Sequence, residues 1–357
     1  MRRALVVGAG PAGAGFAWML KRLAPEWEVE VWEKHPEDAQ IGFGVTMPPS
    51  ILDRIDYGGP RWRVTSSYLS YLGERHLEHE IELVTVERTS FVRWLRKALN
   101  DSGVAMRYEQ PLEARVPEGF DLVVGADGVN SAIRSLVVPP EDVRRESAST
   151  FHTWLSVNRT FDGLETIFRP HGGDLFLAFV YPYSAATSTF IVECTGDSWR
   201  RRQFGRMQSA EALKALSEVF HLDLSGARLD AGVDLRWGRF PHLAVTGGAR
   251  GNKVLIGDAA HTANYAGGFG TLLALEDAVA LAQAVADHDE VENALEHFVA
   301  SRKRDVAGRQ QRALSRHHWH ARVMREYEQG EHEAVRRACF EVERMMVALS
   351  GGRALGN

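Results

Sequence analysis

The stretch Ala4-Leu5-Val6-Val7-Gly8-Ala9-Gly10-Pro11-Ala12-Gly13 decides how the first part of this chain folds. Its four leading apolar residues show no alternation with polar ones, which is typical of a strand buried on both faces. The three glycines follow the spacing of a dinucleotide-binding loop. The first permits a tight turn, the second lets the backbone approach a pyrophosphate, and the third lets the following helix pack on the strand. Free N–H groups at the start of that helix would then face the phosphates.

Glu33 follows Gly13 by 20 residues and ends a second strand, in which Val29 and Val31 alternate with glutamates. Between the two strands, apolar residues recur at helical spacing until Pro25 closes the helix. A carboxylate at this place accepts hydrogen bonds from ribose hydroxyls and repels a 2′-phosphate, so NADP fits this loop poorly. An ordinary glycine turn is the alternative interpretation, but strand, loop, helix, strand and acid all agree with a nucleotide site.

Two more glycine-bearing signatures occur later, each after a short apolar run that reads as a buried strand. One runs from Asp121 to Asp127-Gly128, and the other from Gly257-Asp258 through His261 to Gly267-Gly268-Phe269-Gly270. A lone Asp-Gly pair is most often a simple turn. The ordered set of three indicates one dinucleotide site built from distant segments.

The rest of the chain divides into segments of different predicted secondary structure. Residues 146–236 contain β-like runs rich in aromatic and β-branched residues, such as 174–181 and 188–193, which predict an antiparallel sheet. Segment 62–85 is mixed and aromatic-rich. Helices are expected over 89–99, over 271–287 and through most of 291–349.

The bulk numbers exclude several classes of protein. The 357 residues are enough for two domains, and 45% hydrophobic and 25% charged residues are ordinary for a soluble protein. A net charge of −5 argues against a nucleic-acid partner. Cys194 and Cys339 form no metal-binding pair, so no metal site is expected. No run approaches a membrane span, and a cytoplasmic location is expected.

Together the three signatures closely resemble those of the FAD-dependent aromatic hydroxylases, the group that includes para-hydroxybenzoate hydroxylase. The resemblance covers nearly the whole chain. It implies an α/β fold with a Rossmann-like FAD-binding domain of the GR2 type, an inserted antiparallel β-sheet substrate domain and a helical C-terminal tail. We place the FAD-binding domain at 1–61, 86–145 and 237–290, the substrate domain at 62–85 and 146–236, and the tail at 291–357.

The resemblance also implies roles for single residues. Asp127 would lie near the FAD pyrophosphate and the path of NAD(P)H, and Asp258 would bind the ribityl chain. N–H groups of the 268–272 loop would face the flavin edge that carries negative charge after reduction. Arg88 would lie near FAD, although a solvated arginine at a helix start is the plainer alternative. The expected cofactor-binding residues are Gly8, Gly10, Pro11, Ala12, Gly13, Glu33, Lys34, Gly44, Arg88, Asp127, Asp258, Gly268, Phe269, Gly270, Thr271 and Leu272.

Several stretches narrow the resemblance to a subgroup that holds the violacein-pathway indole hydroxylase and the salicylyl-CoA and anthraniloyl-CoA hydroxylases. They are Ile41-Gly42-Phe43-Gly44-Val45, 168–172, 188–194 and 264–271. Asn264-Tyr265-Ala266 replaces the proline that most of the wider family has before the glycines, which leaves the shape of the substrate side open. The stretches support a subgroup and select no substrate.

The implied activity is that of an aromatic monooxygenase in secondary metabolism. FAD reduced by NADH or NADPH would react with O₂ to a C4a-hydroperoxide, and an electron-rich aromatic substrate would take up its distal oxygen. The substrate would be an aryl-CoA thioester or an indole-type intermediate. A FAD-dependent reductase, or a flavoprotein that binds a pathway intermediate without catalysis, is the alternative. The protein would be a monomer or a homodimer.

Candidate catalytic residues on the substrate side are His171, Tyr181 and Tyr265, with Tyr183 as a further candidate. Tyrosines in a sheet are more often packing residues. His317, His318, Trp319 and His320 are expected on a solvated helix face, with a cap over the pocket as the alternative, and His261 is expected to be structural. Arg200-Arg201-Arg202 could bind the phosphates of CoA, although a short basic run is usually solvated.

Overall fold

The computed structural model describes residues 2–39, 42–112, 116–333 and 335–338. It divides the chain into two compact units. The first unit is formed by 1–61, 86–147 and 241–316, and the second by 62–85, 148–240 and the residues from His317 onward. Ile41, in one of the family-like stretches, and Cys339 lie outside the described residues.

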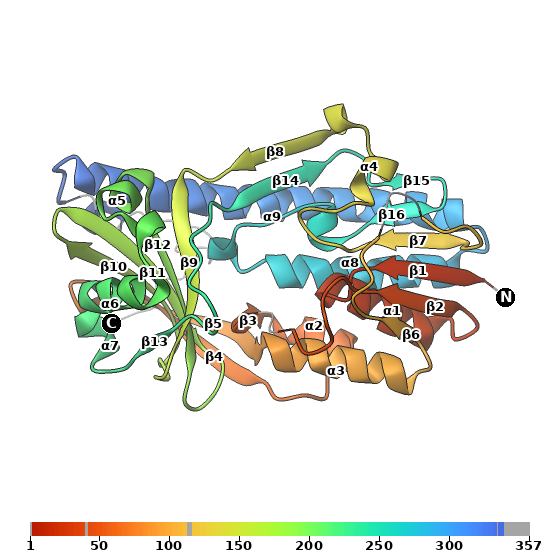
Figure 1. Cartoon of the computed structure of the whole chain (residues 1–357), viewed down its shortest axis with the longest axis horizontal. Coiled ribbons are helices and arrows are strands. Elements are labelled where there is room, and N and C mark those ends of the chain that lie inside the picture. Colours follow the sequence, from red (N-terminus) through yellow and green to blue (C-terminus); the bar gives the residue numbers. More distant parts are fainter. Residues whose placement is uncertain (1, 40–41, 113–115, 334, 339–357) are drawn as a thin grey trace. The chain divides into compact units, whose positions relative to one another are not determined.

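The first unit is built on a mostly parallel sheet, with strands that run beside one another in the order β15-β16-β7-β1-β2-β6 (Figure 1). Every pair is parallel except β15 with β16. The apolar run before the first glycine loop is the buried central strand, as its lack of alternation predicts. The strands are β1 (Arg3–Val7), β2 (Glu28–Trp32), β6 (Ala105–Arg107), β7 (Leu122–Gly125), β15 (Ala249–Arg250) and β16 (Lys253–Leu255).

Helices of the first unit surround this sheet, and α1 packs against both α8 and α3. Close packing of α1 on α8 depends on small residues: a Cβ at Gly15 would lie 3.2 Å from Leu275 and 3.3 Å from Ala278. The helices are α1 (Pro11–Leu23), α2 (Pro49–Arg54), α3 (Arg88–Asp101), α4 (Arg134–Val137), α8 (Gly270–Asp287) and the short η1 (Pro140–Asp142), η3 (Gly257–Ala259) and η4 (Tyr265–Gly267). The remaining strands are β3 (Gly44–Met47), β8 (Val143–Ser147) and β14 (Pro241–Val245).

The second unit is built on a sheet in the order β13-β9-β12-β11-β10-β4-β5. All of these pairs are antiparallel except β10 with β4, which is parallel, so the expectation of a purely antiparallel sheet is wrong at one place. The strands of that pair lie far apart in the sequence, and turn residues between neighbouring strands cannot predict such a pairing. The strands are β4 (Trp62–Tyr71), β5 (Glu74–Glu87), β9 (Thr150–Val157), β10 (Leu164–His171), β11 (Asp174–Pro182), β12 (Ser188–Thr195) and β13 (Leu229–Asp230).

Aromatic residues from the sheet and the short helices form the core of the second unit. The rings of Phe190 and Phe220 meet edge to face with centroids 5.2 Å apart, and Phe176 joins them. The helices here are α5 (Gly196–Arg201), η2 (Phe204–Arg206), α6 (Ser209–Val219) and α7 (His221–Leu224).

The helix α9 (Val291–Glu328) contributes to both units, because residues up to Arg316 group with the first and those from His317 with the second. The segment 291–357, expected as one separate tail, is therefore divided, and residues 339–357 of it lie outside the described chain.

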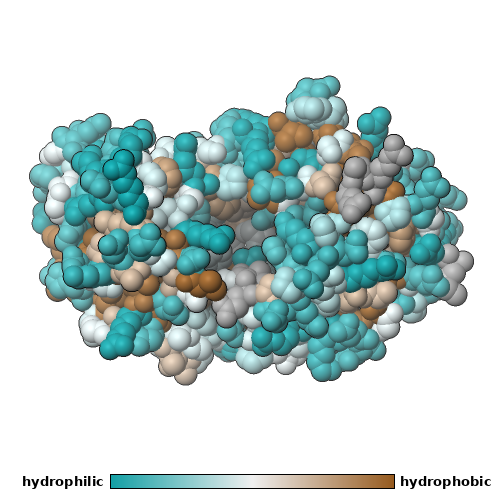
Figure 2. All heavy atoms as spheres, viewed as in Figure 1, coloured by the Kyte–Doolittle hydropathy of each residue, from teal (hydrophilic) through white to brown (hydrophobic). Residues whose placement is uncertain are grey.

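Hydrophilic residues cover most of the face shown in Figure 2, and the apolar ones form scattered small groups. Of the helices in the described part of the chain, none has the length and apolarity to cross a membrane. The α/β fold with an inserted sheet and a helical C-terminal part is confirmed.

Candidate functional site

Two glycines of the first signature, Gly8 and Gly13, lie directly against Ala126 of the second. A Cβ at Gly8 would lie 2.3 Å from the carbonyl oxygen of Ala126, and φ at Gly8 is +105°, a region that side chains disfavour. A Cβ at Gly13 would lie 2.0 Å from the Gly8 oxygen and 3.0 Å from the Ala126 methyl. Only glycine fits at either place, so the turn and the packing of α1 depend on both.

The third signature is joined to the other two by equally specific contacts. Arg134, which is buried, donates to the Val129 carbonyl of the second signature at 3.0 Å and to the Ala259 carbonyl of the third at 2.8 Å. A Cβ at Gly257 would meet the Ala12 methyl at 2.8 Å. The three segments therefore form one continuous site in the first unit, as their order in the sequence predicts.

Glu33 holds the first loop in place. Its buried carboxylate accepts a hydrogen bond from the Ala9 N–H at 2.8 Å and another from the His35 N–H at 3.0 Å. Each carboxylate oxygen has a second lone pair, so the group can still accept from ribose hydroxyls. Lys34, next in the chain, is exposed.

Gly10 leaves open space at the centre of the loop. A Cβ built there would meet no atom within 4 Å, in contrast to Gly8 and Gly13. Its φ of −74° suits any residue, so the fold of the protein gives no reason for glycine here. A bound pyrophosphate gives one, because it needs the backbone at close range beside the start of α1, where Pro11 occupies the first turn.

The start of α8 presents free donors. The helix begins after Phe269 with no side-chain cap, and its first intrahelical bond is that of the Leu273 N–H. Within the described residues, the N–H groups of Gly270, Thr271 and Leu272 have no acceptor. Gly268, in the left-handed region with φ +67°, turns the chain into this helix. An 18-residue helix with an uncapped N-terminus favours a negatively charged partner.

Asp258 lies in a recess, surrounded by protein atoms although its side chain stays accessible to solvent. Desolvation raises the pKa of its carboxyl, and the positive charges of Arg88, His261 and Arg134 act in the opposite direction. Arg88 begins α3, and its N–H donates to the Phe43 carbonyl at 2.7 Å. The charge of Arg88 thus acts on the Asp258 carboxyl.

Asp127 has one oxygen engaged and one without a partner in the described residues. Its Oδ2 accepts from the Ala132 N–H at 2.6 Å, and its buried Oδ1 makes no hydrogen bond. An unpaired buried acceptor is costly, so it marks a place where a bound group or water belongs.

A charged network under the third signature is absent from the sequence-based site. Asp277 on α8 accepts from the Gly257 N–H at 3.0 Å and from Arg302 at 2.8 Å, and its carboxylate lies 2.6 Å from His261 Nε2. Asp277 is buried, and although burial acts to raise the pKa of its carboxyl, His261 and Arg302 lower it. The sequence carried one indication of this network: the acidic residue Asp277 lies within an otherwise Ala- and Leu-rich helix. His261 is structural here, as expected.

The comparisons with known proteins identify the family of this chain. The model of the family "FAD binding domain" matches residues 119–313. The chain is 33% identical over 310 residues to protodeoxyviolaceinate monooxygenase of Chromobacterium violaceum, covering 82% of each protein. The chain belongs to the FAD-dependent aromatic hydroxylases.

Two further comparisons place this hydroxylase more closely. It is 36% identical over 306 residues to salicyloyl-CoA 5-hydroxylase of a Streptomyces species, covering 79% of this chain and 58% of that longer protein. It shares its fold with Klebsiella pneumoniae HpxO, solved in complex with FAD and uric acid, at a TM-score of 0.75 and 18% identity, covering 98% and 96% of the two chains. The hydroxylase is an FAD-dependent monooxygenase, and NAD(P)H is the co-substrate typical of the family.

The candidate substrate-side residues of this hydroxylase do not gather in one place. His171 ends β10 and pairs with Asp174 at the start of β11, whereas Tyr181 lies at the far end of β11. Seven residues of strand separate the two levels, which is about 23 Å at 3.3 Å per residue. One aromatic ring cannot touch both. Burial lowers the pKa of His171, and nearby Arg202 adds to the effect.

The other two candidate tyrosines, Tyr265 and Tyr183, lie outside the strands and are half-buried. Tyr265 belongs to η4 in the first unit, where the Asn264 side chain accepts from the Ala266 N–H at 2.9 Å and fixes the turn. The Tyr183 N–H donates to the Thr187 carbonyl at 3.2 Å in the turn between β11 and β12.

The expectation that this part of α9 is a solvated face is wrong for two of its histidines. His317 and His320 are buried, and their Nδ1 atoms lie 3.3 and 3.8 Å from the carboxylate of Glu193, which is itself buried in β12. His318 between them is exposed, as expected. The helix turns two of its polar residues inward because a buried carboxylate requires polar partners.

The run Arg200-Arg201-Arg202 is not a free basic patch. Arg201 and Arg202 both bind the buried carboxylate of Asp174, with an Arg202 Nε to Asp174 Oδ2 distance of 2.6 Å, and Arg201 also binds Glu328 at 3.2 Å. Arg200, paired with Asp197, lies on the surface, and so does much of the Arg201 side chain. The expected solvated run is therefore right in part, because Arg200 and Arg201 are exposed, but Arg201 and Arg202 are already paired with a buried carboxylate.

Proposed function

We propose that this hydroxylase adds one oxygen atom to a bulky aromatic substrate, either an aryl thioester or an indole-type intermediate. The observation that carries the proposal is the continuous site of the three signatures, together with relatives whose names state activity on such compounds.

The residues of the first unit fit FAD, and we assign them by their geometry. The open space at Gly10 and the start of α1 would take the pyrophosphate, with Glu33 at the ribose. Asp258 would face the ribityl chain. Gly44 in β3 and the exposed Lys34 are proposed to complete the cofactor's surroundings. When bound, FAD supplies the redox chemistry with NAD(P)H and O₂.

The protein's own task is orientation and electrostatics. The unpaired N–H groups at the start of α8 would stabilise negative charge on the cofactor at this end. The network of Asp277, His261 and Arg302 would hold the Gly257-Asp258 turn rigid, because each oxygen of Asp277 is hydrogen-bonded. The protein must also keep water from the reacting atoms.

On the substrate side, Tyr181 and Tyr265 stay proposals, as does His171. The separation along β11 limits the choice, since an aromatic ring that contacts Tyr181 leaves His171 outside hydrogen-bond reach. A hydrogen-bond acceptor beside a phenol or indole N–H would draw electron density into the ring and speed its attack on oxygen.

The test is the rate of NADH and NADPH oxidation by the FAD-loaded enzyme with aryl-CoA thioesters, the matching free acids, and indole or phenol compounds. We expect strong stimulation by one class and little by the others. Equal, weak rates with every compound would contradict the proposed substrate classes. The cytoplasmic location and the monomeric or dimeric state stay predictions, and light scattering would test the latter.

A further inference from the structure

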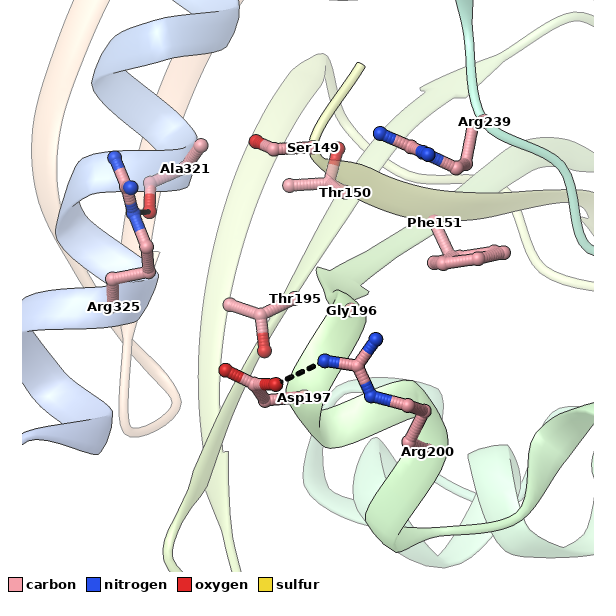
Figure 3. A pocket seen from close by; sticks show the side chains of 10 residues that line it. All are labelled: Ser149, Thr150, Phe151, Thr195, Gly196, Asp197, Arg200, Arg239, Ala321 and Arg325. Carbon is pink, nitrogen blue, oxygen red and sulfur yellow. Dashed lines mark hydrogen bonds and ion pairs between the residues drawn. The ribbon is translucent and has the colours of Figure 1, made fainter. Parts of the chain in front are cut away.

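A pocket of about 330 Å³ lies within the second unit and belongs to none of the groups discussed above. Its walls come from the starts of β9 and α5, the chain before β14 and the last turns of α9 (Figure 3). Three arginines line it, Arg200, Arg239 and Arg325, together with Asp197, Thr195 and Phe151.

The pocket has an excess of positive charge, although the chain as a whole carries −5. Asp197 is its one carboxylate and pairs with Arg200. Across the ranges that the structure describes, neither Arg239 nor Arg325 has an acidic partner. Two guanidinium groups are therefore left uncompensated beside a cavity, where an anion would neutralise them.

Backbone contacts hold these two arginines in place. The Nε of Arg239 donates to the Ala148 carbonyl at 2.6 Å, and the Nε of Arg325 donates to the Ala321 carbonyl at 3.2 Å. Each guanidinium keeps its two terminal nitrogens available. Both residues are exposed to solvent, so these terminal nitrogens can reach a ligand, and the planar fork of a guanidinium suits phosphate oxygens.

Two neighbouring arginines outside the pocket differ, because acidic side chains already neutralise them. Arg201 and Arg202 follow Arg200 directly, but Asp174 and Glu328 neutralise them. The positive charge that is free to bind comes instead from Arg239 and Arg325, which lie far apart in the sequence. No motif in the sequence could reveal this arrangement.

The pocket also has an apolar wall. Phe151 stacks on Trp199 with ring centroids 4.2 Å apart and an angle of 7° between the planes. The pair stiffens this side. Thr195 also lines the pocket (Figure 3), and its hydroxyl is held by the Glu328 carboxylate at 2.9 Å. Such a wall suits a flat organic group attached to the anion.

We propose that this pocket binds a phosphate-bearing organic anion. A phosphate monoester carries close to two negative charges at pH 7, which matches the two uncompensated arginines. Two sources share this chemistry: a free nucleotide, and the phosphorylated handle of a thioester such as CoA. The proposal concerns binding in the second unit and stands whether or not the proposed substrate class is right.

The test is calorimetric titration of the FAD-loaded protein with pyrophosphate, ADP and CoA at low salt. We expect saturable binding of at least one probe, weakened by added salt. Arg239→Ala with Arg325→Ala should lower its affinity about tenfold or more. Arg206→Ala, which removes an exposed arginine of the same unit outside the pocket, should leave the affinity unchanged.

The tightest probe identifies the source: CoA above ADP indicates a thioester handle, and equal affinities indicate a free nucleotide. The single variant Arg325→Ala provides the same comparison if loss of the Arg239 contact to Ala148 disturbs folding, with FAD content as the check. The absence of binding by every probe, or binding that the arginine variants leave unchanged, would overturn the proposal.

Discussion

Single residues divide into those that the fold requires and those that a ligand requires. Gly8 and Gly10 lie two positions apart, yet a Cβ at the first meets the Ala126 carbonyl at 2.3 Å and a Cβ at the second meets nothing. Spacing alone cannot separate the two cases. The structure does, because it shows which glycine is crowded by protein and which faces open space.

This difference gives a matched pair of variants. Gly10→Ala should leave the melting temperature of the apoprotein almost unchanged and raise the Kd for FAD at least about tenfold, because its Cβ takes up space at the pyrophosphate. Gly8→Ala should lower the stability of the apoprotein itself by about 2 kcal/mol, through its positive φ and the clash. Calorimetry and flavin fluorescence measure both quantities. Normal FAD binding by the Gly10 variant would refute the assignment.

Glu193 is a second residue whose role depends on its surroundings. Burial acts to raise the pKa of its carboxyl, but the hydrogen bonds and charges of His317 and His320 prevail and hold the pKa well below its ordinary value of 4.5. A carboxyl with a lowered folded-state pKa stabilises the fold above its unfolded pKa. That contribution declines as the pH falls below about 4.5.

Glu193→Gln should therefore lower stability at pH 7 by about 3 kcal/mol, because it leaves two buried histidines without their acid. It should also flatten the loss of stability between pH 4.5 and pH 3. Thermal melts across pH check both effects, with Glu82→Gln on the exposed face of β5 as control. If both variants give the same curve as wild type, the buried ion pair contributes nothing.

At the scale of elements, the start of α8 connects sequence, helix electrostatics and cofactor chemistry. A helix N-terminus with unpaired N–H groups prefers negative charge, whether it comes from a side chain or from a ligand. The two compete for the same place, so a substitution that favours the helix should harm the cofactor.

Thr271→Asp tests this competition. The added carboxylate should leave the melting temperature unchanged or slightly raised, since it lies in the first turn of the helix. It should lower the reduction potential of bound FAD and slow NAD(P)H oxidation, because it repels negative charge on the reduced cofactor. Thr271→Val, with the same shape and no charge, is the control. An unchanged potential in the Asp variant would place the flavin elsewhere.

Elements with a strong local signal were predictable from the sequence. The strand and helix around the first glycine loop, the helices that became α3 and α8, and the strands β11 and β12 all lie within a few residues of expectation. Pairings between distant segments were not predictable, as the parallel β4–β10 pair shows. The same holds for the buried faces of His317 and His320 and for the arginine pocket, because these depend on contacts that no local pattern encodes.

At the scale of the whole molecule, two compact units serve different tasks. The first brings three signatures from residues 8–13, 121–128 and 257–270 into one continuous site. The second supplies a broad, mostly antiparallel sheet whose core is packed with aromatic side chains. The family membership rests on both units, because the matching family model spans residues 119–313 and so includes 148–240 of the second unit.

The most direct test of the central claim is the source of oxygen in the product. The FAD-loaded enzyme would be supplied with NADH or NADPH, its stimulating aromatic substrate and ¹⁸O₂, and the product analysed by mass spectrometry. A monooxygenase should incorporate one ¹⁸O atom per product molecule, with no turnover when O₂ is removed. Product that forms without O₂, or that carries oxygen only from water, would contradict the account.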